Sequence, residues 1–338
     1  MHRYLITGGA GFIGSALARA LLARGDRVRI IDDFSSGRRQ NLADIATRVE
    51  IIDGNILNPA LLEQAMAGVK VVFHLAALPP VPTAAADPIA YHAVNATGSL
   101  NVLEAARRGG ARRVVYASSA AAYGDNPVVP KMETMVPSPV SPYGASKLAG
   151  ELYCQVYAAA YGVESVCLRL FNVFGPRQNH RSEHAAVIPR LITSALVGQA
   201  PVIFGDGAQS RDFCFVDNVV DAHLKAAHVP RAAGRIYNIG SGIPTTLNEV
   251  LAAIAEAIGR PLTARHEAAR PGSVRHSVAD IAAASATLGY SAAIDLDEGL
   301  RQTIAWYRKS RSTSGSFIST ELPNEPPQDP RPASRLML

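Results

Sequence analysis

The chain has 338 residues, of which 48% are hydrophobic and 18% charged, so it is long enough to bury one large core or two modest ones. Its net charge of +5 is spread along the sequence rather than gathered in one patch, which disfavours nucleic acid as a partner. No apolar run is long enough to cross a bilayer or to act as a signal peptide, so we expect a cytoplasmic protein that is not bound to a membrane. The three cysteines, Cys154, Cys167 and Cys214, are too scattered to indicate disulfides or a metal site, so we expect no metal.

The first segment of the chain, residues 3–15, has the pattern of a strand, a tight turn and a helix. An apolar run ends at the glycines Gly8, Gly11 and Gly14, and an alanine- and leucine-rich stretch follows. The first glycine permits the turn, the second lets backbone approach a phosphate, and the third allows the helix to pack closely against the strand. A helix that opens directly off a strand points its unpaired N–H groups beyond the strand end, so we expect a pyrophosphate to bind there.

Acidic residues at the end of the next predicted strand indicate which dinucleotide binds. Residues 27–31 form that strand, which ends in Asp32 and Asp33. A carboxylate at this position accepts hydrogen bonds from the adenosine ribose and repels a 2′-phosphate, so we predict NAD rather than NADP. Arg38 and Arg39 would tolerate the 2′-phosphate of NADP. Asp32 and Asp33 stand before them in the chain, however, which makes NADP the less favoured cofactor. The alternative interpretation is an ordinary glycine-rich loop beside a surface acid.

Strands and helices alternate along the rest of the first half. Strands are predicted at residues 48–52, 70–74, 113–117 and 163–170, and helices at 12–23, 59–66 and 89–108. Continuous apolar strands are typical of parallel sheets buried on both faces, so the predicted fold is α/β, a Rossmann-type doubly wound parallel sheet. Asn55 follows the third strand, where its amide would face an adenine. His74 closes an apolar strand, which favours a core histidine over a base or ligand.

Three polar residues around the end of strand 113–117 are the predicted catalytic group. Ser119 follows the strand, at the edge where parallel sheets bind their ligands. A loop over residues 125–142, which we expect to be able to close over a substrate, then leads into a helix. Tyr143 and Lys147 are four residues apart on that helix, so they share one face. A lysine charge beside a phenol lowers the tyrosine pKa from ~10 toward neutrality, which suits a general acid/base; the alternative is a solvated helical pair.

Together these motifs resemble the extended short-chain dehydrogenase/reductase family, and more closely its NAD-dependent nucleotide-sugar 4-epimerases of the UDP-glucose and UDP-N-acetylglucosamine type. The resemblance covers residues 4–307 and rests on Thr-Gly-Gly-Ala-Gly-Phe-Ile-Gly, Asp32, His-Leu-Ala-Ala, Asn95, Ser-Ser-Ala-Ala-Ala-Tyr-Gly and Tyr-Gly-Ala-Ser-Lys. It implies that Ser119, Tyr143 and Lys147 are catalytic and that Asn95 supports the helix and the site around them. The cofactor-binding residues that we expect from the motifs and the resemblance are Gly8, Gly11, Phe12, Ile13, Gly14, Asp32, Asp33, Ser36, Gly37, Asn55, Ile56, Leu75, Ala76, Ala77, Asn95, Tyr143, Lys147 and Phe171.

The second half of the chain is predicted to bind the substrate. Asn172 follows strand 163–170 in a loop at the ligand end of the sheet. Arg211 and Arg270 carry guanidinium groups suited to bidentate phosphate contacts, although either one alone would as often form a surface ion pair. The resemblance implies a UDP-sugar substrate bound by Ser119, Tyr143, Asn172, Val187, Phe204, Arg211, Arg270 and Ser277.

We expect three parts in the chain. An NAD-binding domain covers residues 1–170, with part of the later chain returning to it, and a smaller C-terminal substrate-binding lobe covers residues 171–310, with helices at 247–257, 280–288 and 295–306. Residues 311–338 are rich in serine and proline and show no hydrophobic periodicity, which predicts a flexible tail. The resemblance implies a homodimer formed by helices 89–108 and 143–160, whose alanine-rich faces allow close packing.

The residues that follow Ser119 favour one reaction of the family. Its sugar dehydratases and decarboxylases carry acidic residues there, whereas this chain has alanine at positions 120, 121 and 122. The predicted function is therefore 4-epimerisation through a transient 4-keto intermediate. The alternatives are another NAD-dependent nucleotide-sugar modification, of the reductase or decarboxylase type, or a non-catalytic NAD-binding protein. Pro79 and Pro80 stand where many UDP-glucose epimerases have a lysine, and the small Ser277 favours an N-acetylated sugar as a substrate beside UDP-glucose.

Overall fold

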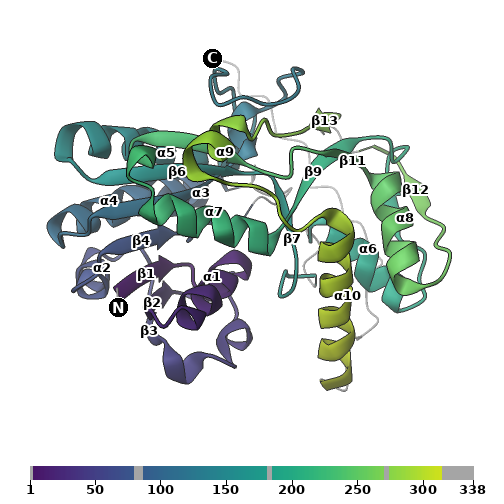
Figure 1. Ribbon diagram of the computed structural model, residues 1–338, viewed down its shortest axis with the longest axis horizontal. Helices are drawn as coiled ribbons and strands as arrows, with labels where there is room; N and C mark the ends of the chain where they lie inside the picture. Colours follow the sequence, from purple (N-terminus) through teal and green to yellow (C-terminus); the bar gives the residue numbers. More distant parts are fainter. Residues whose placement is uncertain (1–2, 80–86, 181–184, 270–273, 314–338) are drawn as a thin grey trace, which may run out of the picture.

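The computed structural model describes residues 3–79, 87–180, 185–269 and 274–313. Its centre is a seven-stranded parallel sheet with the strand order β10-β6-β5-β4-β1-β2-β3 (Figure 1). The strands are β1 (Arg3–Thr7), β2 (Arg27–Asp32), β3 (Glu50–Asp53), β4 (Val71–His74), β5 (Arg113–Ser119), β6 (Glu164–Leu170) and β10 (Arg235–Ile239). The strand order reverses between β1 and β4, and ligands of doubly wound sheets bind at the carboxyl ends beside such a reversal. The prediction of a Rossmann-type α/β fold is confirmed.

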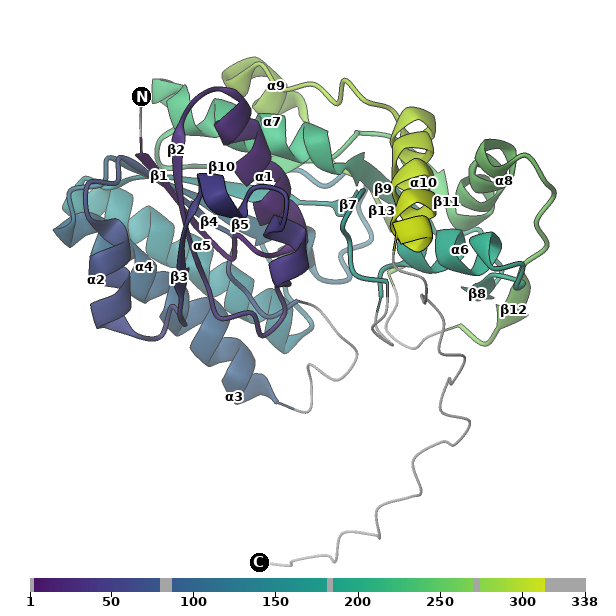
Figure 2. The same ribbon diagram turned by 90° about the horizontal axis from the view of Figure 1, so that it is seen from below.

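Helices cover both faces of this sheet. α1 (Phe12–Ala23) and α7 (Val216–His228) pack on one face, and α2 (Pro59–Met66), α4 (Gly98–Arg108) and α5 (Pro142–Tyr161) pack on the other (Figures 1 and 2). Leu5 and Ile6 are successive residues of β1, yet they belong to the two different cores. Because side chains alternate along a strand, burial of both faces requires the continuous apolar runs seen in the sequence.

The predicted helix over residues 89–108 is not continuous. It begins as α3 (Pro88–Tyr91), continues as a π-helical segment (His92–Thr97) and becomes α4 at Gly98. Asp87 caps its start by accepting a hydrogen bond from Ala90 N at 3.0 Å. The wider π turn changes the direction of the side chains relative to a regular α-helix, and Asn95 lies within it, fully buried.

A second lobe, formed mainly by residues after 171, packs around a separate core (Figure 2). Its helices are α6 (Val187–Leu196), α8 (Leu247–Ile258) and α10 (Leu296–Thr313). Its strands are β7 (Asn172–Phe174), β8 (Val202–Phe204), β9 (Ser210–Phe215), β11 (Pro244–Thr246), β12 (Arg265–Glu267) and β13 (His276–Ser277). The later chain also returns to the large sheet, where α9 (Ala282–Leu288) packs beside β10.

The ends of these elements differ from the prediction by a few residues. α10 runs to Thr313, past position 311 where the tail is predicted to begin, and α9 begins at Ala282 rather than at residue 280. Asp280 instead accepts a hydrogen bond from Ala282 N at 2.8 Å, in the turn that precedes the helix. Residues 314–338 of the predicted tail lie outside the described residues. Among the described helices, none combines the length and the apolar character that a membrane crossing requires.

Candidate active site

A cleft of about 1400 Å³ runs along the carboxyl ends of the sheet strands and faces the second lobe. All of the predicted cofactor residues except Asn95 line it, namely Gly8, Gly11, Phe12, Ile13, Gly14, Asp32, Asp33, Ser36, Gly37, Asn55, Ile56, Leu75, Ala76, Ala77, Tyr143, Lys147 and Phe171. The second lobe contributes most of the predicted substrate residues to the same cleft. The fold therefore brings two distant sets of residues to one site.

The glycine turn between β1 and α1 is shaped to admit a ligand close to the backbone. Gly8 has φ 71°, a conformation that favours glycine, and a Cβ at this position would lie 2.7 Å from Ala76 N. A Cβ on Gly14 would lie 2.3 Å from Gly8 O, so only glycine lets α1 start this close to the turn. Gly11 precedes α1 and provides no side-chain cap, which leaves the first N–H groups of the helix to bind an anion.

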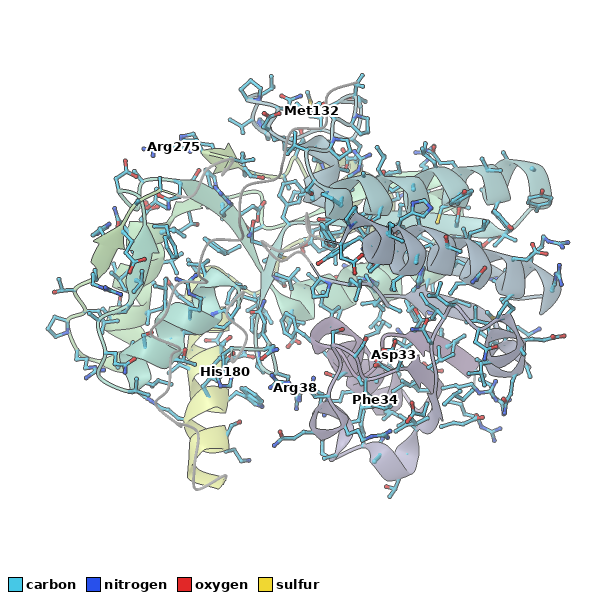
Figure 3. All side chains as sticks on the ribbon, turned by 180° about the vertical axis from the view of Figure 1, so that it is seen from behind. Asp33, Phe34, Arg38, Met132, His180 and Arg275 are labelled. Carbon is cyan, nitrogen blue, oxygen red and sulfur yellow. The ribbon has the colours of Figure 1, made fainter. Side chains whose placement is uncertain are left out.

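The two acids at the end of β2 have different roles. Asp32 is buried and accepts hydrogen bonds from Ala10 N at 2.8 Å and Phe34 N at 2.9 Å, so it braces the glycine turn. Burial raises the pKa of Asp32, and these two hydrogen bonds oppose that rise. Asp33 is exposed in the cleft, where it accepts from Ser35 Oγ at 2.6 Å and from Asn55 Nδ2 at 2.7 Å. Asp33 is thus the more accessible acid for a ribose, and Figure 3 labels it close to Phe34 in the N-terminal part of the chain.

Asn95 and His74 support the site from behind. Asn95 Oδ1 accepts from Leu78 N at 2.8 Å, and Asn95 Nδ2 donates to Ser146 Oγ at 3.1 Å, so it joins the loop after β4 to α5. The ring nitrogens of His74 bond to Thr7 Oγ1 at 2.7 Å and Ser99 Oγ at 2.8 Å. Burial, helped by the charge of Lys147, lowers the pKa of His74 to about 3. The prediction of His74 as a core histidine is confirmed.

Ser119 and Tyr143 meet in the cleft. Ser119 ends β5, and its Oγ accepts a hydrogen bond from Ala121 N at 3.1 Å. Tyr143 stands in the first turn of α5, which Ser141 caps by accepting from Gly144 N at 3.1 Å. Both residues line the cleft, and Ser119 is near enough to lower the pKa of the Tyr143 phenol against the effect of burial. A strand end and a capped helix start therefore bring the two hydroxyl groups to one part of the cleft.

Lys147 does not act on Tyr143 as the sequence predicts. Burial raises the pKa of Tyr143, and the nearby Ser119 hydroxyl opposes this rise, so the expected fall toward neutrality is wrong for this arrangement of side chains. Lys147 is itself buried, which lowers its pKa to about 8. Its Nζ lies 4.3 Å from the centroid of the Tyr116 ring, so the ammonium is directed at β5 rather than into bulk water.

The loop over residues 125–142, which the sequence predicts to be able to close over a substrate, is anchored outside the cleft in this structure. Lys131 N donates to Val278 O and Asp280 N donates to Lys131 O, both at 2.8 Å. Ser138 N donates to Ala122 O at 3.0 Å. This segment, which the structure describes throughout, contributes no residue to the cleft lining. It buttresses β13 and the turn after β5 instead.

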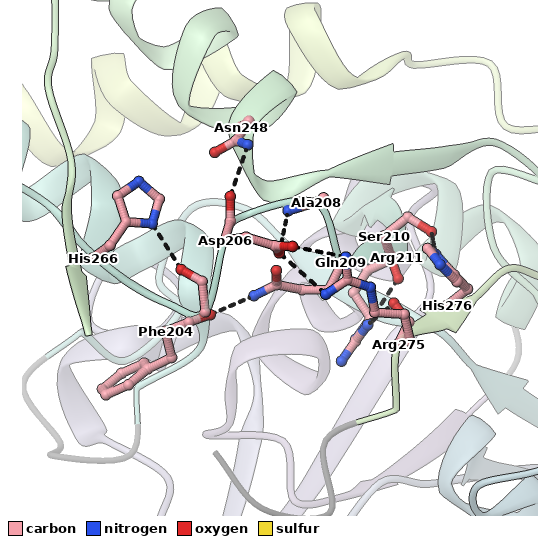
Figure 4. A network of polar contacts seen from close by, with 11 residues as sticks. Phe204, Asp206, Ala208, Gln209, Ser210, Arg211, Asn248, His266, Arg275 and His276 are labelled. Carbon is pink, nitrogen blue, oxygen red and sulfur yellow. Dashed lines mark hydrogen bonds and ion pairs between the residues drawn. The ribbon is translucent and has the colours of Figure 1, made fainter. Parts of the chain in front are cut away.

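The second lobe brings Asn172, Val187, Phe204, Arg211 and Ser277 into the cleft lining, whereas Arg270 lies outside the described residues. Figure 4 shows the turn between β8 and β9 that carries part of this set. Arg275 Nη2 pairs with Asp206 Oδ2 at 2.8 Å, and Gln209 Nε2 donates to Phe204 O at 2.7 Å. These two contacts hold the turn that precedes Arg211 on β9.

Sequence reasoning missed two polar residues at this end of the cleft. Gln209 Oε1 is a buried acceptor without a hydrogen-bond partner among the described residues, and Gln209 lines the cleft. Arg190 lies over the Phe204 ring, with Cζ 5.2 Å from its centroid. Gln209 stands two residues before Arg211, and this spacing would have placed both on one strand face. No such signal pointed to Arg190.

No metal centre accompanies these groups. Across the described ranges, no group of three or more His, Cys, Asp or Glu side chains is arranged to hold a metal ion. Cys154, Cys167 and Cys214 are buried free thiols.

Comparison with known proteins agrees with this geometry. The model of the NAD dependent epimerase/dehydratase family matches residues 4–240, more than half of the chain. The chain belongs to this family. Its NAD cofactor suits the residues present, because the tight glycine turn, the uncapped start of α1 and the exposed Asp33 form a cradle for a dinucleotide.

Individual members of the family are similar over nearly their full length. A UDP-glucose 4-epimerase of Mycolicibacterium smegmatis is 40% identical over 311 residues, covering 90% of this chain and 98% of that protein. The structure of a UDP-N-acetylglucosamine 4-epimerase from Methanobrevibacter ruminantium, in complex with UDP-N-acetylmuramic acid, matches with a TM-score of 0.87 at 37% identity and covers 91% of this chain and 99% of that one. A Thermus thermophilus UDP-glucose 4-epimerase in complex with NAD matches with a TM-score of 0.82 at 35% identity, covering 90% and 99%.

Proposed function

We propose that this chain catalyses the NAD-dependent 4-epimerisation of a UDP-hexose or UDP-N-acetylhexosamine through a transient 4-keto intermediate. The observation that carries the proposal is that Ser119 and Tyr143 line one cleft together with the dinucleotide cradle and the lining residues of the second lobe. The relatives named above support the choice of UDP-sugar.

The residues divide the chemistry among them. Tyr143 takes the proton of the sugar 4-hydroxyl and later returns it, while Ser119 holds the same oxygen by a hydrogen bond. Lys147 is buried one helical turn after Tyr143 on α5 and lines the same cleft. NAD, when bound, accepts the hydride from C4 and gives it back. Asn172 and Arg211 would hold the diphosphate while the keto sugar turns over, so that C4 is inverted.

The acids of the cleft argue against elimination or decarboxylation. Of the described residues that line it, Asp32 and Asp33 alone carry carboxylates, and both lie at the end of β2. Beside Ser119 the lining consists of Ala120 and Ala121. Removing a proton from a sugar carbon needs a base close to that carbon. Among these lining residues, no carboxylate lies beside Tyr143 that could act as this base.

The direct test is to incubate the purified protein with UDP-glucose, UDP-galactose and their N-acetylated counterparts and to follow inversion at C4 by NMR. We expect interconversion without added NAD and without release of NADH, since oxidation and reduction balance on one carbon. Stoichiometric NADH in solution would instead indicate a one-way dehydrogenase or reductase. Binding of NAD without any turnover of these sugars would indicate a non-catalytic binding protein.

Ser277 supports acceptance of N-acetylated sugars. It is a small residue of β13 that lines the cleft, and a similar protein whose structure is known is a UDP-N-acetylglucosamine 4-epimerase. Replacing it by tyrosine should depress activity on the acetylated sugar selectively, because exclusion of one acyl group amounts to a few kcal/mol. The exposed Ser291→Tyr serves as the control. Equal loss on both sugars, or no acetylated activity in the parent protein, would remove Ser277 from this role.

We also propose a homodimer that is formed by α4 and α5. These helices pack against each other, and one face of α5 leaves Leu152 55% exposed and Val156 52% exposed. Two large apolar side chains four residues apart on a helix favour a protein partner, and a two-fold axis would let the face cover itself. Cytoplasmic location and the lack of a nucleic-acid partner stay predictions of the sequence.

A further inference from the structure

Arg38 connects the two halves of the molecule at the cofactor end of the cleft. It belongs to the loop that follows Asp33, and its Nη2 donates a hydrogen bond to Asn179 Oδ1 in the second half of the chain. Both residues line the cleft. Figure 3 shows Arg38 at the edge of the first half, directed toward the segment that carries His180. The contact therefore crosses the cleft instead of lying on one wall.

Each partner in this contact is firmly held. Arg38 N donates to Ala10 O at 3.0 Å, and Asn41 Nδ2 donates to the same oxygen at 2.9 Å, so Arg38 is attached to the glycine turn. On the other side, Tyr307 Oη donates to Gln178 O at 2.8 Å. A contact between two anchored segments limits how far the cleft can open at this point.

The position of the contact relates it to the adenosine side of the dinucleotide. Asp33 and the glycine turn flank Arg38, and an acid at the end of this strand is where the ribose of such cofactors binds. The sequence left Arg38 only as a residue that would tolerate a 2′-phosphate. The carboxylates of the buried Asp32 and the exposed Asp33 disfavour a 2′-phosphate. Recognition of NADP therefore does not account for Arg38.

We infer that the Arg38–Asn179 contact is a bridge across the cleft that retains the bound dinucleotide by slowing its release. The inference rests on the proposed function, since an epimerase must keep its cofactor through two opposite hydride transfers. Asn179 then belongs to the cofactor site although it comes from the second half of the chain and acts through Arg38. Asn179 is therefore a positioning residue. Its replacement changes the rate of cofactor release more than it changes the rate of epimerisation.

The test measures release of the cofactor and needs no sugar. Full-length protein is loaded with the fluorescent analogue ethenoadenine NAD and chased with excess NAD, and the release rate is followed by fluorescence. Asn179→Ala and Arg38→Ala should each release the analogue about tenfold faster, the size expected for loss of one hydrogen bond to a charged group. Asn179→Asp keeps the acceptor and should release it within about twofold of the parent rate.

Two further variants test whether Arg38 and Asn179 act through one shared contact. The double variant R38A/N179A should release the analogue no faster than the faster single variant, because both changes remove the same hydrogen bond. Arg39→Ala is the matched control, since Arg39 pairs with Asp53 and does not line the cleft. Parent-like release by Asn179→Ala, or release by the double variant at the product of the two single effects, would overturn the bridge. If sugars are not epimerised but the release rates follow this pattern, the proposed function fails and the bridge stands.

Discussion

Tyr143 is a half-buried phenol whose pKa is raised by burial, and Ser119 opposes this rise. A phenol with a raised pKa is protonated at the start of the reaction cycle. Neighbouring groups must therefore stabilise its phenolate form for it to accept and return a proton. Ser119 is the neighbour that lowers the pKa of this phenol, whereas the ammonium of Lys147 lies over the Tyr116 ring. At the scale of single residues, the proposed chemistry therefore depends on a few contacts at the end of β5 and the start of α5.

Tyr143→Phe removes the proton-transfer group but keeps the ring, which packs edge-on against Tyr91 with centroids 6.4 Å apart. We expect kcat for 4-epimerisation to fall about 10²- to 10⁴-fold while bound NAD stays at the parent level. Rates come from NMR, and cofactor content from the absorbance of the denatured supernatant. Tyr153→Phe, on the exposed side of the same helix, should behave as the parent does. Near-normal turnover in Tyr143→Phe would exclude Tyr143 as the acid/base.

At the scale of secondary-structure elements, the junction of β1 and α1 offers a test of close packing. Alanine normally favours a helix over glycine by about 1 kcal/mol, yet a Cβ on Gly14 would lie 2.3 Å from Gly8 O and 2.8 Å from Gly9 Cα. Both neighbours are backbone, so Gly14→Ala should lower the free energy of unfolding by about 2 kcal/mol or more and weaken NAD binding. Urea titration and calorimetry measure the two effects.

Gly98→Ala is the matched control for this junction. Its Cβ would meet the end of the flexible Ile56 side chain, with Cδ1 at 2.5 Å, rather than backbone. We expect a smaller loss of stability than for Gly14→Ala, and NAD affinity closer to that of the parent. A Gly14→Ala variant that is as stable as the parent and binds NAD equally well would show that α1 can move away from the turn.

The outer face of α4 and α5 carries the dimer prediction. Val156→Arg places a charge in the middle of the proposed isologous interface, where the partner's copy of the same face would meet it. The dissociation constant of the dimer should rise by about tenfold or more, as seen by analytical ultracentrifugation. Gln64→Arg, on the exposed side of α2, should leave the parent dimer intact. A parent protein that is monomeric at micromolar concentration would contradict the dimer.

At the scale of the whole molecule, buried histidines link stability to pH. Burial lowers the pKa of His223 to about 4, while a histidine in the unfolded chain titrates near 6.5. The unfolded chain therefore binds this proton first, so the stabilising contribution is complete above about pH 6.5 and declines as the pH falls toward 4. His74, whose pKa is lowered to about 3, acts in the same direction.

We expect the free energy of unfolding of the parent to fall between pH 7 and pH 5, and the fall to be smaller by about 2 kcal/mol in His223→Leu. Urea titrations at the two pH values measure the difference. His92→Leu is the control, because His92 is exposed and should leave the pH dependence unchanged. If His223→Leu follows the parent curve, burial of a neutral imidazole is not a source of acid sensitivity here.

Much of the fold and of the site could be read from the sequence because the deciding features are local. The glycine spacing at Gly8, Gly11 and Gly14 meets steric limits set within one turn of backbone, and the continuous apolar strands reflect burial on both faces of a parallel sheet. Ser119 and Tyr143 stand at element ends that turn and capping residues mark in the chain. Because the strands of the large sheet are parallel, their carboxyl ends lie along one edge of the sheet, and residues at those ends come together there.

Only the tertiary structure decided how these residues act on one another. The π turn around Asn95, the division of roles between Asp32 and Asp33, the unpartnered oxygen of Gln209 among the described residues and the Arg38–Asn179 contact depend on chain segments that are distant in sequence. The pKa of Tyr143 changes in the direction opposite to the sequence prediction, because burial raises it by more than Ser119 lowers it. Burial and long-range contacts arise from the packing of many elements at once, and spacing along the chain does not encode them.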